Sequence, residues 1–457
     1  MRPRSVPRRL LHRLGSLAAC TALAVALSPA AAAPAAAADP VPGDQPLPGH
    51  TIHNPPLTPA VVGGTPARVL QGVHEHAAYD IEVPPKWNGE LVMWAHGYRG
   101  DGTVLTVDPP PFGLRQKLLD QGYAWAASSY YANGYDVRAG VLGTHDLATL
   151  FRDRVRRPSR TFIVGASMGG HVIGRSLEQY PRFYAGALPM CGVLGDNALF
   201  DFFLDYNLVA QDLADIDAYP PPAGYPTGVV PKIQRALGLD GLRPGGPDTT
   251  NERGKQLRAI TINRSGGDRP GALASFAVWK DFLFQFGAAP TGDDSLAANP
   301  MKVATNLLTR YSPDSPEPVN RTVERVPPAS PRDRLSPGLS AVPQIFGVPT
   351  APVLSLHGLG DMFVPFSMEQ AYRSDVARHG DPRLLVQRAV RTSQHCEFSD
   401  AEAGAAWDDL SAWVHRGTRP AGDDVRDPSA ADFGCRFSDR AAYVAGTGTR
   451  RLYSPCP

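Results

Sequence analysis

Runs of apolar residues and amphipathic stretches alternate along most of the chain. Short apolar runs predict strands, whereas apolar residues that recur every three or four positions predict helices. The predicted strands are Tyr79–Val83, Glu90–Ala95, Tyr123–Ala127, Thr161–Gly165, Tyr184–Met190, Pro352–Leu356 and Leu384–Val390. The helices predicted between them are Leu114–Gln121, His145–Val155, Met168–Tyr180 and Met368–Arg378. This alternation is typical of an α/β fold with a mostly parallel sheet flanked by helices.

The alternation stops between Met190 and Pro352. Four helical patterns occupy this gap, separated by loops rich in Pro and Gly: Asp201–Ile216, Glu252–Asn263, Ala272–Phe286 and Ala297–Tyr311. A structureless loop of this length is uncommon within a compact domain. We therefore expect a helical unit over residues 197–348, inserted into a sheet domain formed by residues 39–196 and 349–417.

The first segment, residues 1–38, has the pattern of a secretory signal. Five arginines and no acidic residue are followed by the apolar run Leu17–Leu27 and then by Ala- and Pro-rich sequence. This order predicts a signal peptide cleaved after Ala33 or Ala38. Because the apolar run is too short to span a bilayer, we expect a secreted protein with no stable membrane anchor.

Two other export signals overlap this segment. Leu17–Cys20 matches a lipoprotein signal, but most of the apolar run follows Cys20 when it should precede it. The pair Arg8-Arg9 matches a twin-arginine signal, but the flanking residues fit that signal poorly. Both remain alternatives to the ordinary secretory signal.

Composition and charge narrow the classes of partner. Hydrophobic residues make up 43% of the chain and charged residues 19%, a balance that is typical of globular proteins. The formal net charge is +1, and without the five arginines of the predicted signal 40 basic residues face 44 acidic ones. A chain with this balance is not expected to bind nucleic acid.

The most informative motif lies where a predicted strand meets a predicted helix. Gly165-Ala-Ser167-Met-Gly169 follows the strand and opens the helix, in the G-x-S-x-G pattern of a nucleophile elbow. Side chains at positions 165 and 169 would collide with neighbouring backbone in so tight a turn. The motif predicts a strained Ser167 with an exposed hydroxyl group.

On this motif the chain resembles the α/β-hydrolase superfamily and, more loosely, its secreted actinobacterial esterases and lipases. The resemblance covers about residues 65–417. It implies an α/β-hydrolase fold in which the helical unit is a cap inserted after the sixth strand. It also implies a triad in the chain order Ser, acid, His.

The resemblance implies Asp361 and His395 as the partners of Ser167. Asp361 lies just beyond the seventh strand, and His395 lies in the loop after the eighth, where this superfamily carries its acid and its base. Ser167 would attack the substrate, His395 would act as general base, and Asp361 would orient His395. Glu397 is an alternative orienting group. The competing residues lie in helices or in turns beside them: Asp375, Asp381, His379 and His415.

The same resemblance implies an oxyanion hole of two main-chain donors. The first is the N–H of Met168, directly after the nucleophile. The second is the N–H of Tyr98, in the His96-Gly97-Tyr98 sequence that ends the third strand. We expect His96 to brace this loop rather than to act as a second base.

Four cysteines remain after removal of the predicted signal, and they allow three connectivities. Cys435 and Cys456 lie in residues 418–457, a polar tail expected at the surface, and local pairing is the simplest choice. Cys191 follows the sixth strand and Cys396 follows His395, so the resembled fold brings both to one edge of the sheet, and we expect a disulfide between them. The alternative for this second pair is two buried free thiols.

Metal and cofactor motifs are absent from the sequence. No CxxC or HExxH pattern occurs. His74 and His76 flank Glu75 in a predicted strand, which would place both imidazoles on one face, but such pairs are more often surface residues than ligands. We expect neither a metal ion nor a cofactor.

The predicted cap suggests the substrate class. It carries many aromatic residues, some of which are expected to line an apolar pocket: Phe202, Phe203, Tyr206, Phe276, Trp279, Phe282, Phe284 and Phe286. We therefore expect a small carboxylic ester with an apolar or aromatic part. A secreted aminopeptidase or amidase of the same fold is the alternative, with an acidic anchor drawn from Asp201, Asp205, Asp212 and Asp215. The third possibility is a binding module on an inactive hydrolase scaffold.

Overall fold

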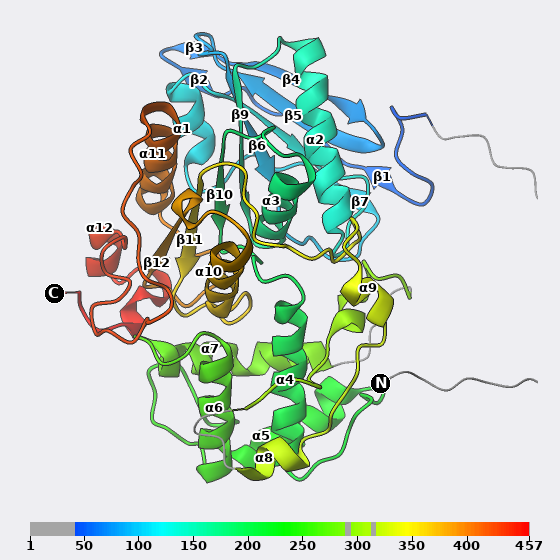
Figure 1. The fold of residues 1–457 in the computed structure, drawn as a ribbon, viewed down its shortest axis with the longest axis vertical. Helices are drawn as coiled ribbons and strands as arrows, with labels where there is room; N and C mark the ends of the chain where they lie inside the picture. Colours follow the sequence, from blue (N-terminus) through cyan, green and yellow to red (C-terminus); the bar gives the residue numbers. More distant parts are fainter. Residues whose placement is uncertain (1–41, 288–293, 312–316, 457) are drawn as a thin grey trace, which may run out of the picture. The chain divides into compact units, whose positions relative to one another are not determined.

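The computed structural model describes residues 42–287, 294–311 and 317–456, so the predicted signal and Cys20 lie outside the described residues. The description concerns the unit Val41–Pro457. Its main feature is an eight-stranded sheet with the strand order β12-β11-β10-β9-β6-β8-β5-β4, drawn in Figure 1. The strands are β4 (Arg68–His74), β5 (Ala77–Val83), β6 (Glu90–Ala95), β8 (Ala124–Ser128), β9 (Arg160–Ala166), β10 (Gly186–Met190), β11 (Val353–Gly358) and β12 (Leu385–Val390).

The sheet is mostly parallel, as the alternating pattern predicts. Only the pairings β4–β5 and β5–β8 are antiparallel. Short two-stranded pairs lie outside the main sheet: β1 (Thr51–Ile52) with β7 (Val104–Leu105), and β2 (Val61–Val62) with β3 (Thr65–Pro66). The strands that carry the candidate site, β9 to β12, are adjacent and parallel, so their carboxyl ends meet at one edge.

The prediction for His74 and His76 is wrong. β4 ends at His74, and Glu75 and His76 form the two-residue turn of a β-hairpin in which His74 pairs with Ala77. Both turn residues have positive φ, 46° and 67°, the backbone of a type I′ hairpin turn. The two imidazoles therefore do not share the face of one strand.

Helices cover both faces of the sheet. Along β6, Val92 and Trp94 pack with α1 (Leu114–Asp120) and α11 (Asp400–Arg416), whereas Leu91 and Met93 pack with the opposite layer. That layer is formed by α2 (Val137–Arg154), α3 (Met168–Gln179) and α10 (Ser367–His379). Successive side chains of a strand point to opposite faces of the sheet. Because both faces are covered by helices, the domain has one apolar core on each face.

Helix α2 begins eight residues before the predicted start at His145, since Asp136 caps it by accepting a hydrogen bond from the N–H of Ala139. Gly140 and Gly143 weaken the helical pattern in its first half. Gly140 is needed for packing, because a Cβ there would overlap the Val172 side chain of α3. Close contact between the two helices therefore overrides the weak local propensity.

The residues between β10 and β11 form helices and loops, without a strand in the parts described. In Figure 1 these helices gather beyond the ends of the central strands. Their core includes Met168 and Met362, which neighbour Ser167 and Asp361. The helices are α4 (Ala198–Leu213), η1 (Tyr225–Val229), α5 (Val230–Leu237), α6 (Glu252–Arg264), α7 (Ala272–Leu283), η2 (Phe284–Gly287), η3 (Pro300–Val303), α8 (Glu317–Thr322) and α9 (Pro331–Leu335).

The predicted helix Ala297–Tyr311 is wrong, because only the short 3₁₀ turn η3 forms there. The backbone beyond it bonds to distant groups rather than to its own preceding turn. Asp201 accepts a hydrogen bond from the N–H of Thr305, and the side chain of Asn306 bridges the backbone of residues 324 and 326. Tertiary contacts thus prevent the helix that the apolar spacing predicts.

The sequence predicts that the tail, residues 418–457, lies at the surface. This prediction is wrong for part of the tail. Val425, Arg450 and Tyr453 are buried, and Tyr453 belongs to a fourth apolar cluster with Leu359 of the sheet domain. The tail contains η5 (Gly448–Leu452) and α12 (Arg440–Val444), while η4 (Pro382–Leu384) precedes β12. Among the described residues, no helix has the length and apolar character needed to cross a bilayer.

Candidate active site

Ser167 occupies a sharp turn between β9 and α3. Its backbone has φ 59° and ψ −124°, a conformation that is strained for a residue with a side chain. Gly165 and Gly169 allow this turn, because a Cβ at 165 would come within 2.5 Å of the Ala95 carbonyl oxygen and a Cβ at 169 would overlap it. The local sequence therefore places the hydroxyl group at the carboxyl end of β9.

The structure brings Ser167, His395 and Asp361 into one hydrogen-bonded chain. The Nε2 atom of His395 lies 2.8 Å from the hydroxyl oxygen of Ser167. Its Nδ1 atom lies 2.6 Å from Oδ2 of Asp361, which is fully buried. The other carboxylate oxygen of Asp361 accepts hydrogen bonds from the backbone N–H groups of Phe363 and Val364 at 2.9 and 3.1 Å. These bonds fix the carboxylate beside the imidazole.

The two candidate oxyanion donors are the backbone N–H groups of Met168 and Tyr98. Met168 is the first residue of α3, so its N–H has no acceptor within the helix. A Cβ on Gly97 would come within 3.0 Å of the Ser167 Cβ, which shows how closely the loop before Tyr98 approaches Ser167. The side chain of Tyr98 has no part in this role, since its hydroxyl donates to Asp101 at 3.0 Å and the residue is 44% exposed.

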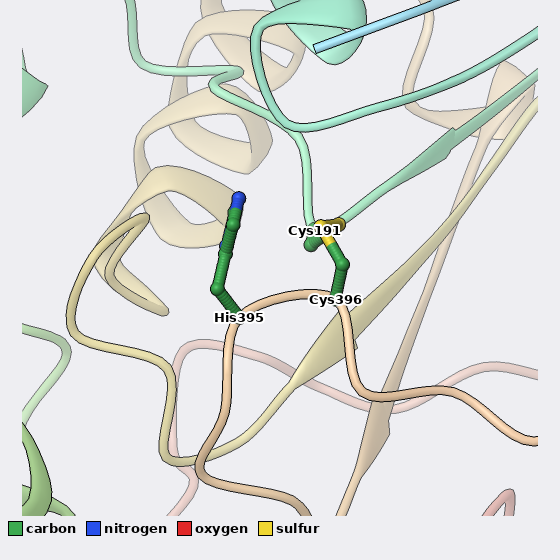
Figure 2. A group of neighbouring side chains, drawn as sticks. All are labelled: Cys191, His395 and Cys396. Atoms are coloured by element: carbon green, nitrogen blue, oxygen red, sulfur yellow. A yellow bond between two sulfur atoms is a disulfide. The ribbon is translucent and has the colours of Figure 1, made fainter. Parts of the chain in front are cut away.

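A disulfide joins the loop that carries His395 to the end of β10. Figure 2 shows the Cys191–Cys396 bond beside the imidazole of His395, and the two Cα atoms are 5.3 Å apart. The second predicted disulfide, Cys435–Cys456, is also present. Cys191, His395 and Cys396 are close enough together to resemble a metal-ligand set, but both sulfur atoms are used by the disulfide.

An aromatic cluster lies next to His395. The ring of Phe363 contacts the imidazole of His395 edge-on at 4.9 Å between centroids. Phe282 and Phe286, from the helical segment, lie 4.9 and 5.8 Å from Phe363. These three rings are only half-buried, so they retain apolar surface beside the hydrogen-bonded chain. Phe203, which stacks on Phe286 at 3.7 Å, supports the cluster from α4.

The competing acids and bases are engaged elsewhere. Asp375 pairs with Arg378, Asp381 pairs with Arg383, His379 contacts the Phe346 carbonyl and His415 contacts Glu90. Glu397 does not reach His395. Its carboxylate accepts hydrogen bonds from the backbone N–H and the hydroxyl of Thr449, in the tail. The sequence analysis did not predict this contact. The one sequence feature that pointed to an ordered tail is the cysteine pair that encloses residues 435–456.

Two buried histidines near Ser167 have lowered pKa values. Burial lowers the pKa of His96 to about 3, and its ring stacks on Tyr130 at 3.8 Å between centroids. Burial also lowers the pKa of His171, four residues after Ser167, to about 4. His171 accepts from the Tyr135 hydroxyl and contacts the Pro343 carbonyl oxygen, so it ties α3 to the chain before β11. Both side chains brace loops and helices around the site.

No protein-family model matches the sequence. One characterised relative is the o-phthalyl amidase of Xanthobacter agilis, which is 36% identical over 62 residues. That alignment spans 14% of this chain and 14% of the relative.

Solved structures with a similar arrangement include two proteins from Aspergillus oryzae. An esterase matches at 13% identity with a TM-score of 0.48, covering 83% of this chain and 86% of the esterase. Feruloyl esterase B matches at 12% identity with a TM-score of 0.44, covering 77% of this chain and 80% of that protein. With identities and TM-scores this low, the function has to be argued from the site itself.

Proposed function

We propose that the protein is a secreted serine hydrolase that cleaves carboxylic esters through an acyl-enzyme intermediate. The observation that carries this proposal is the hydrogen-bonded chain from Asp361 through His395 to Ser167. It supplies a nucleophile, a base within reach of its proton, and a buried carboxylate that orients the base. The resemblance of the elbow to that of the α/β-hydrolase superfamily supports the same chemistry.

The geometry defines a role for each group during acylation. His395 Nε2 takes the hydroxyl proton as Ser167 Oγ attacks the ester carbonyl carbon. The resulting imidazolium is stabilised by Asp361, which stays ionised. His395 then gives the proton to the leaving alcohol, and the acyl group remains on Ser167. Water, activated by the same base, later releases the acid and restores the hydroxyl group.

The charge that develops on the carbonyl oxygen needs preorganised donors. We assign this role to the main-chain N–H groups of Met168 and Tyr98. The first lies at the N-terminus of α3, where the helix dipole favours negative charge. Loss of one such donor typically costs about 2.7–4 kcal/mol of barrier stabilisation. Because both donors are backbone groups, Tyr98→Ala is expected to have a small effect.

The substrate is expected to carry an apolar or aromatic part. Phe282, Phe286 and Phe363 offer partly exposed rings beside the imidazole of His395. We assign residues 197–348, which contribute two of these rings, as a cap over the carboxyl edge of the sheet. Aromatic surface beside a few fixed polar groups is typical of a small-molecule site. Neither a metal ion nor a cofactor takes part in the proposed steps.

The four carboxylates that the sequence suggests as an amine anchor argue against an aminopeptidase. An aminopeptidase needs an unpaired acid to bind the substrate amine. Asp201, Asp205 and Asp215 are each paired with an arginine, Arg334, Arg264 and Arg253 respectively. Asp212 accepts a hydrogen bond from the Thr322 hydroxyl. These four carboxylates thus bind groups of the protein itself rather than a substrate amine. This favours a neutral ester substrate.

Cleavage of amides is the second candidate function. The short alignment with o-phthalyl amidase favours it, since that relative is named for an amide of an aromatic acid. A binding module without activity is disfavoured, because the site has a nucleophile, a base and an acid in contact. Secretion is supported by the predicted signal and by two disulfides, which persist in oxidising compartments.

Two sets of chromogenic substrates separate the candidates. The first contains p-nitrophenyl esters of aliphatic acids of graded length and of aromatic acids. The second contains p-nitroanilides of the same acids together with aminoacyl p-nitroanilides. The proposal expects ester turnover that is lost in Ser167→Ala. If only the p-nitroanilides of the simple acids are cleaved, the protein is an amidase. If only the aminoacyl p-nitroanilides are cleaved, it is an aminopeptidase.

A further inference from the structure

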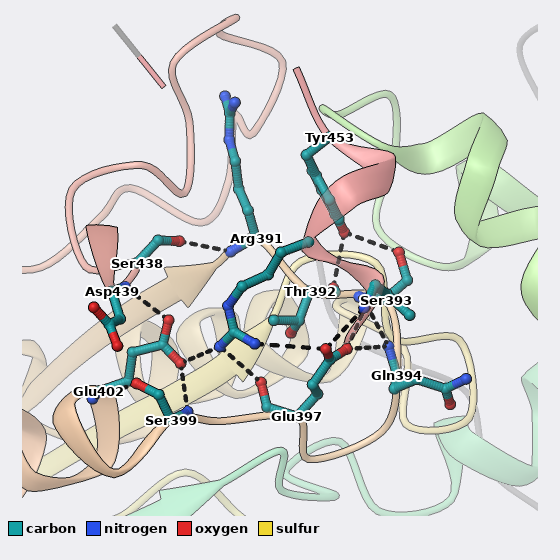
Figure 3. Close-up of polar contacts among 12 residues, drawn as sticks. Arg391, Thr392, Ser393, Gln394, Glu397, Ser399, Glu402, Ser438, Asp439 and Tyr453 are labelled. Atoms are coloured by element: carbon teal, nitrogen blue, oxygen red, sulfur yellow. Dashed lines mark hydrogen bonds and ion pairs between the residues drawn. The ribbon is translucent and has the colours of Figure 1, made fainter. Parts of the chain in front are cut away.

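The loop that carries His395 is held by the C-terminal end of the chain. We define the base loop as residues 391–399, between β12 and α11, and the C-terminal segment as residues 431–456, closed by the Cys435–Cys456 disulfide. Figure 3 shows polar contacts that join residues of both parts: one pair at Arg391 and Ser438, and a larger group around Glu397 and Glu402. None of these contacts is implied by the Ser-acid-His pattern.

The first anchor is Arg391, at the start of the base loop. Its side chain is buried, and its guanidinium group donates to the carbonyl oxygens of Phe433, Ser454 and Ala431. The backbone N–H of Arg391 donates to the Ser438 hydroxyl at 2.8 Å. One side chain of the base loop thus binds carbonyl groups near both ends of the C-terminal segment.

The second anchor is Thr449, which contacts the residues just before His395. Its hydroxyl accepts hydrogen bonds from the backbone N–H groups of Ser393 and Gln394 at 2.7 and 3.4 Å, and it bonds to Glu397 on the other side of His395. The backbone N–H of Thr449 also donates to Glu397 at 2.9 Å. Thr449 therefore joins the two flanks of His395 by its hydroxyl group.

The third anchor is an ion pair at the end of the base loop. Arg450 binds Glu402 at 2.6 Å, and both side chains are almost fully buried, at 3% and 1% exposure. Glu402 also accepts from the backbone N–H of Ser399, as part of the capping box that begins α11. Burial raises the pKa of Glu402, and Arg450 opposes that rise. The ion pair fixes the point where the base loop enters the helix.

A fourth contact links the C-terminal segment to the acid as well as the base. The Tyr453 hydroxyl donates to the Thr392 carbonyl oxygen at 2.8 Å. A Cβ on Gly360, the residue before Asp361, would overlap the same hydroxyl group. Tyr453 therefore packs against both strand ends that carry the acid and the base.

We propose that the C-terminal segment is a positioning element for His395, and that Thr449 is its central positioning residue. The inference rests on the proposed function, because it concerns the base of that reaction. His395 must keep contacts of 2.8 Å to Ser167 and 2.6 Å to Asp361 at the same time. On one side Cys396 ties the loop to β10, and on the other Thr449 ties it to η5. Removing either tie loosens the imidazole without altering the surfaces that bind substrate.

Variants at Thr449 test the inference, because they retain both disulfides. Thr449→Val keeps the shape of the side chain and removes its hydroxyl group, whereas Thr449→Ser keeps the hydroxyl group. Thr447→Val is the matched control, since Thr447 is exposed and makes no capping hydrogen bond with its side chain. Ester hydrolysis, thermal unfolding and amide hydrogen exchange across residues 391–399 are measured for each protein.

We expect Thr449→Val to lower kcat about tenfold while KM changes by less than about twofold, since geometry rather than binding is lost. Exchange at Ser393 and Gln394 should become faster. Thr449→Ser and Thr447→Val should stay close to the unmodified protein. A Cys435→Ser/Cys456→Ser variant should show the same kcat loss, because it opens the C-terminal segment.

Equal kcat in Thr449→Val and in the unmodified protein would overturn the inference. A kcat loss as large in Thr447→Val would also overturn it, because a general destabilisation of the tail would then suffice. Failure of the proposed function has a different signature, namely an unmodified protein that turns over neither ester nor anilide.

Discussion

Ser167 and His395, the proposed nucleophile and base, are in hydrogen-bond contact, but the protein holds them by different means. The turn at Ser167 depends on its neighbours in sequence, because the absence of side chains at Gly165 and Gly169 lets it pack against the Ala95 carbonyl of β6. His395 is fixed by groups far from it in sequence, chiefly Cys191 and Thr449. The elbow is therefore a local structure, whereas the base loop has the geometry that the rest of the chain imposes.

This difference predicts how each region tolerates change. A local turn fails when a single close contact is blocked, and it fails as a whole. A loop held by several distant contacts loses them one at a time, so each variant lowers the rate by a limited factor. The predictions below test this difference, from the largest expected effect to the smallest.

Asp361→Asn should have the largest effect, because it removes the carboxylate that the structure shows bound to the imidazole of His395. The amide can hold the imidazole in the wrong tautomer, so we expect kcat to fall by roughly 10⁴-fold. Ester hydrolysis by the purified variant measures this loss. Asp381→Asn is the control, since Asp381 lies in a turn and pairs with Arg383, and it should keep full activity. A similar loss in both variants would contradict the assignment of the acid.

Gly169→Ala should break the elbow. A Cβ at this position overlaps the Ala95 carbonyl, a main-chain group that cannot rotate away. We expect a loss of unfolding free energy of about 1–3 kcal/mol or more, together with loss of labelling at Ser167. Denaturant unfolding and reaction with a fluorophosphonate measure the two effects.

The matched control is Gly404→Ala in α11. There the atoms nearest to the Cβ would be those at the end of the Lys117 side chain, at 3.2 Å, and alanine favours a helix over glycine. This variant should be as stable as the unmodified protein or more stable. Equal destabilisation in both variants would mean that the Ala95 contact has no special role.

Removal of the Cys191–Cys396 disulfide should affect the base loop but not the elbow. We expect a Cys191→Ser/Cys396→Ser variant to lose about tenfold in kcat with a smaller change in KM. Both cysteines have positive φ, 44° and 55°, so the bond holds backbone that would otherwise relax. Steady-state kinetics and thermal unfolding test this. Full activity at an unchanged melting temperature would show that the disulfide does not hold the base.

The smallest predicted effect concerns pH and the helix that follows the elbow. His171 has a pKa of about 4 in the folded protein because of burial, against an ordinary value of 6.5. Between these values the unfolded chain binds more protons, so stability falls as the pH drops from 6.5 to about 4. In His171→Gln, the free energy of unfolding should fall by on the order of 1–2 kcal/mol less over this pH range than in the unmodified protein. Thermal unfolding across this range measures it, and an unchanged slope would contradict the assignment.

The local part of the site was predictable from sequence. The run from Thr161 to His171 contains the strand, the glycines and the start of the helix, so pattern and steric argument were sufficient. The seven predicted strands also form, with ends that shift by a few residues. Apolar runs of this kind predict buried parallel strands because both faces of such strands are covered.

The long-range part was not predictable. The spacing of apolar residues over Ala297–Tyr311 predicts a helix, but Asp201 binds the backbone there. The polar composition of the tail predicts an exposed segment, but Arg450 and Tyr453 are buried against the base loop. Each of these outcomes depends on a partner more than 50 residues away in sequence, such as Glu397 for Arg450 at 53 residues. The spacing of apolar residues reflects only local structure, so it cannot reveal such distant partners.

The central claim is that Ser167 is a nucleophile activated by His395. Its most direct test is reaction of the purified protein with a fluorophosphonate, followed by digestion and mass spectrometry of the labelled peptide. The account predicts one label per chain, on Ser167, and no label in Ser167→Ala. A label on another residue, or labelling that persists in Ser167→Ala, would contradict it.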